Sequence, residues 1–172
     1  MDLQTVTQMI KTMNLSFRMI LAAIILNTFF AGCSSKPAYY DAISFEKGSW
    51  NRFRYLNFEF LTDNPEMTYD LSVIITYNDY INIDMLPVNV VMVLPGGEER
   101  IREYNIFLKE RNGAMKGEKK EGRYELKVLL RESQQFTEKG PVKIEIENLN
   151  PKLETPGVLS FGLLVEKNTT DH

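Results

Sequence analysis

The chain has 172 residues with one cysteine, one histidine and a formal net charge of −3 at pH 7. An acidic balance argues against a nucleic-acid partner, because such binding depends on a basic surface. His172, the only histidine, is the last residue, where a chain end is normally too mobile to hold a general base. We therefore expect no enzyme activity, no catalytic residue, no cofactor and no metal site.

The first 32 residues have the pattern of a secretory signal peptide. Lys11 and Arg18 provide a positive flank. The uncharged apolar run from Met19 to Gly32 is shorter than the roughly 20 residues that a membrane-spanning helix needs. We expect residues 1–32 to be removed, so that the mature chain begins at Cys33.

Cys33 follows two small residues, Ala31 and Gly32. This arrangement resembles the bacterial lipobox, in which the chain is cut just before a cysteine whose thiol is acylated. The resemblance implies lipidation at Cys33, and the alternative is a free buried cysteine at the end of an ordinary helix. Residues 33–38 would then be a lipidated tether, because their small polar residues and proline favour neither helix nor core.

The part that follows the signal has 140 residues, which fits a single domain. It has 18 basic and 22 acidic residues, so its net charge is −4. We expect the folded domain to span residues 39–167 and a flexible tail to span 168–172. Translation that starts at Met13 instead of Met1 would leave these boundaries unchanged.

The hydrophobic period of this domain is two residues, which indicates half-buried β-strands. Turns such as Pro95-Gly96-Gly97 separate the apolar runs. The spacing favours an all-β fold, an antiparallel two-sheet β-sandwich of seven to eight strands, because parallel strands need crossovers for which there is no room. The residues expected inside alternate along Leu71–Tyr77, Val88–Leu94, Tyr124–Leu130, Val142–Ile146 and Leu159–Val165.

The stretch around Trp50 carries two further expectations. Trp50 is predicted to lie in the core rather than in a ligand site. The aromatic residues occupy odd positions at Phe53 and Tyr55 but even positions at Phe58 and Phe60. The predicted cause of this shift is a β-bulge near Leu56 and Asn57.

The oxygen-rich and aromatic residues allow three kinds of site. Calcium could be held by Asp63–Glu66 or by Asn78 and Asp79 with Asn82 and Asp84, but neither group has the spacing of a calcium loop, and ordinary turns are favoured. Carboxylate pairs of glycosidase type are less favoured than solvated strand faces. Five rings could form a sugar platform, although packing in the core or at its rim is the simpler interpretation: Tyr39, Tyr40, Trp50, Tyr55 and Tyr80.

Several segments occur in a recognisable order after the cysteine. They are YYDAISFEKGSW, FRYLNFEF, YDLSVIITYNDYINIDMLPVNVVMVLPGG, RNGAMKGE and GPVKIEIENL followed by GVLSFGLLVEK. This order resembles the GldH-type gliding-motility lipoproteins of Bacteroidetes. The resemblance implies an outer-membrane-anchored, non-enzymatic accessory or assembly factor of gliding motility and the associated protein secretion, with cell-envelope proteins as partners. The alternative is a lipid-anchored module that binds a glycan or another small ligand.

The residues after Cys33 bear on the orientation of the anchored domain. Surface-exported lipoproteins of this bacterial group often carry acidic residues just after the cysteine. Here Ser34, Ser35 and Lys36 follow, and the first acid is Asp41. We therefore expect a domain that faces the periplasm.

Residues 109–122 form the longest segment without a period-two pattern. Gly113 and Gly117 bracket Met115, which is followed by Lys116. A glycine-bent backbone that presents one apolar side chain among lysines suits a protein contact, so this loop is the expected partner-binding element. A solvated connection between two strands is the alternative.

Overall fold

The structure is a computed structural model that describes residues 37–168. The predicted signal peptide, Cys33 and most of the predicted tether lie outside these residues. The described part of the chain has eleven strands and no helix, so the all-β prediction is confirmed. Between residues 37 and 168 there is thus no helix of the length and apolarity that a membrane span requires.

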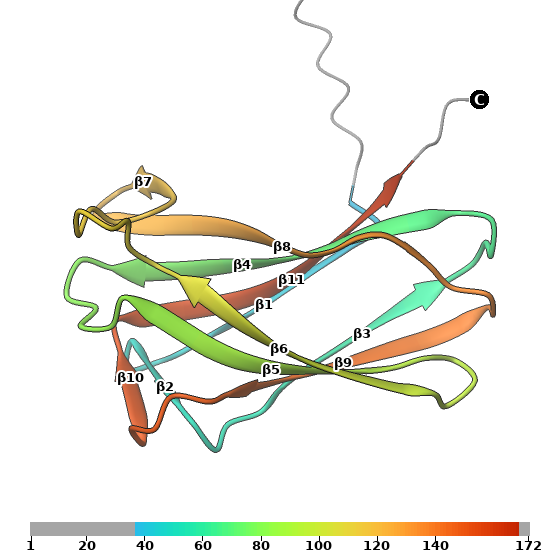
Figure 1. The fold of residues 1–172 in the computed structure, drawn as a ribbon, viewed down its shortest axis with the longest axis horizontal. Coiled ribbons are helices and arrows are strands. Elements are labelled where there is room, and N and C mark those ends of the chain that lie inside the picture. The colour runs from blue at the N-terminus through green and yellow to red at the C-terminus, as the bar shows by residue number, and fades with distance from the viewer. Residues whose placement is uncertain (1–36, 169–172) are drawn as a thin grey trace, which may run out of the picture. The chain divides into compact units, whose positions relative to one another are not determined.

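Five strands form the larger sheet, in the spatial order β1-β11-β4-β8-β7 (Figure 1). Every neighbouring pair in this sheet is antiparallel. In that order the strands are β1 (Tyr39–Ser44), β11 (Val158–Asn168), β4 (Thr68–Asn78), β8 (Arg123–Gln135) and β7 (Glu118–Lys120).

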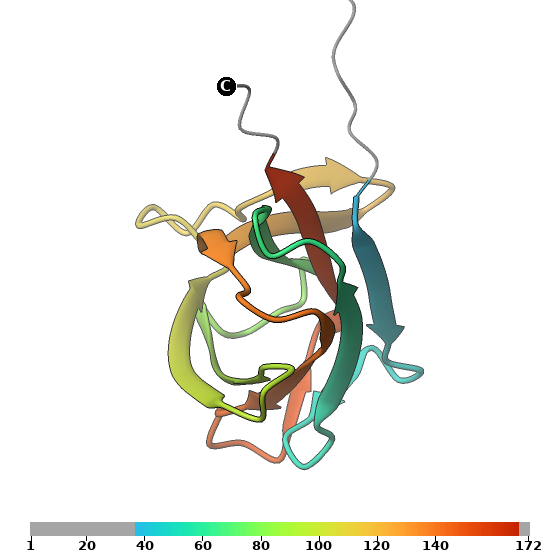
Figure 2. The ribbon, with the colours of Figure 1, turned by 90° about the vertical axis from the view of Figure 1, so that its right-hand side faces the viewer.

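A four-stranded sheet, in the order β3-β9-β5-β6, forms the second layer (Figure 2). It is also antiparallel throughout, and a separate two-stranded antiparallel ribbon contacts β11 of the larger sheet. Eight of the eleven strands have six or more residues, which matches the predicted seven to eight. The strands of the second layer are β3 (Leu56–Thr62), β9 (Gly140–Asn148), β5 (Met85–Val93) and β6 (Glu99–Phe107), and those of the ribbon are β2 (Ser49–Asn51) and β10 (Glu154–Pro156).

The core fills the space between the two larger sheets. Strands β3, β5 and β9 alternate buried and more exposed residues, as the period of two predicted. Trp50 is fully buried, with its ring 5.6 Å from that of Phe45 and 5.1 Å from that of Phe161, so the prediction that it belongs to the core is confirmed. Burial of each large apolar side chain stabilises the fold by about 1.5–3 kcal/mol.

The predicted bulge near Leu56 and Asn57 is wrong. The β3–β9 ladder runs from Leu56 opposite Ile146 to the end of β3 without a register shift. The parity changes because the residues before Leu56 form a turn, in which the Arg54 amide donates to the Asn51 carbonyl at 2.9 Å. Tyr55 is accordingly exposed and lies outside the strand.

Register shifts occur instead in β11 and β8. In β11 the shift lies between Val158 and Ser160, so Val158 is fully buried and Leu159, which was expected inside, is only half-buried. In β8 the Ser133 residue has a φ of 49°, and its amide donates to the Asp70 carboxylate at 2.7 Å. Bulges of this kind leave alternation visible in sequence but change which residues face the core.

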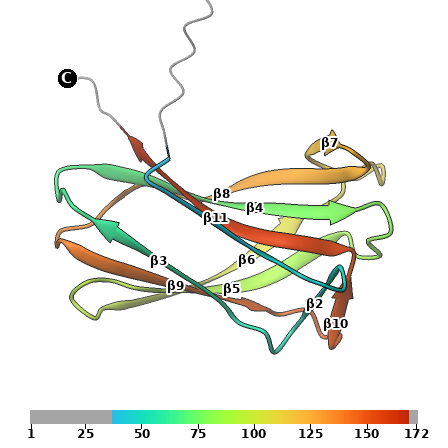
Figure 3. The same cartoon turned by 180° about the vertical axis from the view of Figure 1, so that it is seen from behind.

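The sandwich has two ends that differ in their loops (Figure 3). At the entry end the described chain begins with Tyr39 opposite Val165, close to the turns 63–67, 94–98 and 136–139. At the distal end lie the loops 79–84 and 108–117, which follow the last residues of β4 and β6.

Candidate functional site

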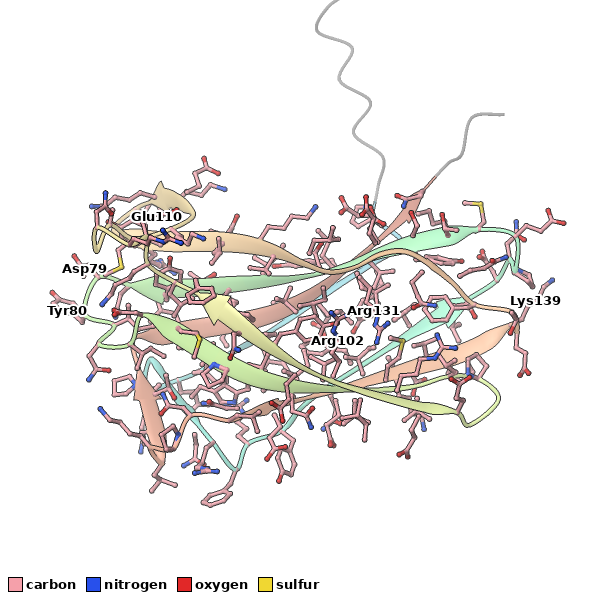
Figure 4. All side chains as sticks on the ribbon, in the orientation of Figure 1. Asp79, Tyr80, Arg102, Glu110, Arg131 and Lys139 are labelled. Carbon is pink, nitrogen blue, oxygen red and sulfur yellow. The ribbon has the colours of Figure 1, made fainter. Side chains whose placement is uncertain are left out.

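Two loops of the distal end are joined to each other. Asp79, Tyr80 and Glu110 lie together at this end, whereas Lys139 lies at the entry end (Figure 4). The Leu108 amide donates to the Asp84 carbonyl at 2.8 Å, and the Lys109 ammonium lies 2.9 Å from the Asp84 carboxylate. The loop 108–117 therefore has a fixed position on the loop 79–84.

A buried hydroxyl ties the same loop to the core. Tyr77 on β4 is fully buried, and its hydroxyl oxygen lies 2.8 Å from the Leu108 carbonyl and 2.5 Å from the Lys116 carbonyl. Since the hydroxyl has one proton, it donates to one of these carbonyls at a time. Burial raises the pKa of Tyr77 to about 12, so the hydroxyl stays a donor at any physiological pH.

The tip of the loop is a closed turn. The Gly113 amide donates to the Glu110 carbonyl at 2.9 Å, and the Glu110 amide donates to the Ala114 carbonyl at 2.7 Å. The Asn112 side-chain oxygen accepts from the Ala114 amide at 3.0 Å. Gly113 has a φ of 83°, a left-handed conformation that glycine adopts without steric cost. The distal end thus presents a preformed turn.

The four loop residues predicted from sequence fall on one short segment with different roles. Gly113 shapes the exposed tip, and Lys116 joins the loop through its backbone. Met115 is half-buried and packs against the core, so it is not the side chain that the tip presents. Gly117 has a φ of 82°, and a Cβ there would overlap the Glu125 carbonyl oxygen.

Three exposed distal side chains lie outside the partner-binding residues that the sequence predicts. Arg111 and Ala114 are exposed at the tip, and Tyr80 is 83% exposed on the neighbouring loop. The signal that could have found the tip is the Asn112-Gly113 pair, a common turn sequence. Nothing in the local sequence indicates that the Tyr77 hydroxyl lies under this loop.

The five rings considered as a sugar platform do not share one surface. Trp50 is buried, and the Tyr39 ring lies 6.0 Å from that of Phe60. Tyr40 is opposite Leu164 on the outer side of β1, near the entry end, whereas Tyr80 is at the distal end.

The oxygen-rich stretches considered for calcium are occupied by turns and ion pairs. The Asn78 side-chain oxygen accepts from the Tyr80 amide at 3.1 Å, as in an ordinary turn. The Lys167 ammonium donates to Asp63 at 3.1 Å and lowers the pKa of that carboxyl. Within residues 37–168 no three histidine, cysteine or acidic residues are grouped as a metal site would require.

The hollows formed by the described residues are small. One of about 130 Å³ lies at the entry end against Pro95 and Phe136, and one of about 210 Å³ lies against Lys120 and Tyr124. A third of about 200 Å³ is lined by polar residues, Glu154 among them. Pockets for drug-sized ligands usually occupy ~300–1,000 Å³, and each of these three hollows is smaller than that.

Among known proteins, likenesses to solved structures are weak, and the informative match is to a protein family. No curated protein matches the chain. A chain from the structure of infectious bursal disease virus Gx strain is 11% identical with a TM-score of 0.30, covering 79% of this chain and 30% of that one. For the Gt strain the identity is 13%, the TM-score 0.30 and the coverage 75% and 31%, so this chain spans about a third of each viral chain.

The sequence model described as GldH lipoprotein matches residues 38–165. This range starts just before β1 and ends within β11, so it includes both large sheets and the distal loops. The chain belongs to the GldH lipoprotein family.

Proposed function

We propose that this lipoprotein is a non-enzymatic accessory or assembly factor of gliding motility and the associated protein secretion. In this proposal Cys33 carries the lipid that anchors the chain to the outer membrane, and the domain faces the periplasm. The distal loops contact another protein of the cell envelope.

The observation that supports this proposal most is the preformed distal turn within a domain matched throughout by the family. Two carbonyls of the loop, those of Leu108 and Lys116, are tied to the buried Tyr77. Because the loop is already ordered, little conformational entropy of the loop would be lost when a partner binds it. The exposed Tyr80 and Arg111 are residue types that often anchor protein interfaces.

The central experiment changes the exposed distal side chains without touching the core. In Tyr80→Ser with Arg111→Glu, we expect the unfolding temperature to stay close to wild type, since exposed substitutions usually change stability by less than about 0.5 kcal/mol. Gliding on agar, cargo secretion and envelope crosslinks should be lost. In a host that does not glide, secretion and crosslinks are the readouts.

The matched control is Tyr40→Ser with Lys139→Glu, which makes similar changes at the entry end. This variant should keep gliding, secretion and crosslinks. If both double variants retain function, the distal docking surface is wrong, and if both lose it equally, the effect does not belong to the distal end.

The anchor is tested on the full chain in the same cells. Cys33→Ala should leave the membrane fraction and should no longer incorporate labelled palmitate. Protease added to intact cells should leave the wild-type domain uncut, because the outer membrane would separate a periplasmic domain from the protease. Unchanged fractionation and labelling of Cys33→Ala would refute the anchor, and digestion in intact cells would refute the orientation.

A further inference from the structure

The outer side of the four-stranded sheet is strongly acidic. It consists of the side chains that alternate with the buried ones on β3, β9, β5 and β6, and we call it the acidic face. Its net charge of −4 equals that of the whole chain from Cys33 onward. Its charged members are five glutamates and one lysine: Glu59, Glu99, Glu103, Glu145, Glu147 and Lys143.

The charged side chains of the acidic face form no ion pairs within the described residues, whereas some of those on the five-stranded sheet do. On the other sheet Lys127 pairs with Glu166 at 2.6 Å, and Lys120 pairs with Glu125 at 3.1 Å. In the register of this sheet Glu59 lies opposite Lys143, and the other four glutamates lie opposite uncharged residues, so the negative charge of the face stays open to solvent.

An apolar strip runs between these carboxylates. Val91 on β5 lies opposite Ile101 on β6, and Ile101 is 65% exposed. In the same strip Asn89 lies opposite both Glu103 and Glu147, and its side-chain oxygen is buried without a hydrogen-bond donor. The face therefore combines exposed apolar surface, negative charge and an acceptor that has no donor.

We propose that the acidic face is a second docking surface, which binds a protein surface rich in lysine and arginine around an apolar patch. Such a partner would neutralise the glutamates, cover Ile101 and provide a donor near Asn89. Four strands about 4.8 Å apart and about eight residues long cover ~500 Å². That is less than the ~800 Å² per partner of a standard interface, so charge attraction carries much of the contact.

This surface is independent of the distal loops and does not rest on their proposed role. The acidic face lies along the strands, whereas Tyr80 and Arg111 lie in loops at one end. Substitutions in one surface should therefore leave contacts of the other unchanged.

The test is photo-crosslinking of the full chain in isolated native envelopes. A benzoylphenylalanine replaces Ile101, and in a parallel strain it replaces Leu129, which is 49% exposed on the other sheet. We expect one discrete adduct at position 101 whose crosslinked peptide comes from a basic surface. Glu103→Gln with Glu145→Gln should reduce this adduct about tenfold. Added salt should reduce it too, because the charges are exposed.

The matched control is Glu118→Gln with Glu166→Gln, which also removes two negative charges, but from the five-stranded sheet. It should leave the adduct at position 101 intact. Thermal unfolding separates binding from folding, because Glu103 and Glu145 are exposed and form no ion pair among the described residues, so that Glu103→Gln with Glu145→Gln should not lower the unfolding temperature. A charge reversal on the identified partner that restores binding to Glu103→Lys with Glu145→Lys would support the proposal further.

Several outcomes would overturn the proposal. They are the absence of an adduct at position 101, an adduct that survives Glu103→Gln with Glu145→Gln, and an equal loss in both double glutamine variants. An adduct that disappears when divalent cations are chelated would also overturn it, because the face would then bind a cation instead of basic side chains.

Discussion

The two ends of the sandwich are held by different kinds of contact. At the entry end, Asp63 of the turn 63–67 accepts from the exposed Lys167 ammonium at 3.1 Å and from the hydroxyl of the buried Tyr69 at 3.3 Å. At the distal end, loop 108–117 is held by the buried Tyr77 hydroxyl. Both ends thus have a hydrogen bond from a buried tyrosine, but the distal loop is held through backbone carbonyls, whereas the entry turn is held through a carboxylate whose charge also attracts Lys167.

Gly117→Ala should have the largest effect on the distal end. The added Cβ would overlap the Glu125 carbonyl, and the backbone φ of 82° is strained for alanine. We expect a loss of about 3 kcal/mol in the free energy of unfolding, measured by chemical denaturation.

Gly113→Ala and Gly97→Ala are the matched controls, one at each end. Their φ values are 83° and 84°, and a Cβ at either position would meet no atom within 4 Å. Each should cost only about 1 kcal/mol, from backbone strain alone. If Gly117→Ala costs no more than these two, the contact with Glu125 does not fix the distal loop.

Tyr77→Phe should have the next largest effect. It leaves the ring in the core but removes the donor to the Leu108 and Lys116 carbonyls, at a cost of about 1–2 kcal/mol. Hydrogen exchange of the Lys116 amide should become faster, while amides of the turn 94–98 stay unchanged. Unchanged exchange at Lys116 would contradict the coupling between this loop and the core.

The same variant should change the response to alkaline pH. The pKa of Tyr77 is raised from 10.0 to about 12 by burial, so between these values the unfolded chain loses the proton while the folded chain keeps it. Stability should therefore fall as pH rises through this window, by up to about 1.4 kcal/mol per pH unit. Tyr77→Phe should remove that part of the slope, and an identical slope in both proteins would refute the assignment.

Asp63→Asn should have the smallest effect, confined to the entry end. The hydrogen bond from Lys167 lowers the pKa of Asp63 below its ordinary value of 3.8, so this contact stabilises the fold above that value. It is lost as pH falls through the lowered pKa. The amide chemical shift of Asn64 should change more in acid in the wild type than in Asp63→Asn, in which only neighbouring carboxyls such as that of Glu66 remain. Acid shifts of the same size in loop 108–117 would erase the distinction between the ends.

Much of the fold could be predicted because the period of two is strong wherever one face of a strand is buried. The pattern is weak in β6, an edge strand whose residues opposite the buried positions of β5 include Arg100 and Arg102. Turns disturb the pattern as well. Phe53 alternates with polar neighbours as a strand residue would, but it is exposed in the turn before β3. Three-residue strands such as β2 and β10 depend on pairing across the chain, which no local pattern reveals.

The candidate site could be predicted only as a location. Polar residues and glycines marked the segment 109–122, but the roles of its residues depend on neighbours that are distant in sequence. Tyr77 is 31 residues before Leu108 and 39 before Lys116, so its hydrogen bonds are visible only in the fold. Met115 is apolar in a polar segment, and the sequence does not reveal whether the core or a partner covers it.

The packing of Trp50 provides an optical readout for these experiments. Trp50 is the only tryptophan, its ring is stacked on Phe45, and its indole nitrogen donates to the Arg54 carbonyl at 2.9 Å. Its fluorescence should therefore be blue-shifted in the folded domain and shift to the red on denaturation. Because Trp50 lies on the ribbon strand β2 and not in the distal loops, a partner that docks on those loops should leave the emission wavelength unchanged. Tryptophan emission would thus report global unfolding separately from loop binding.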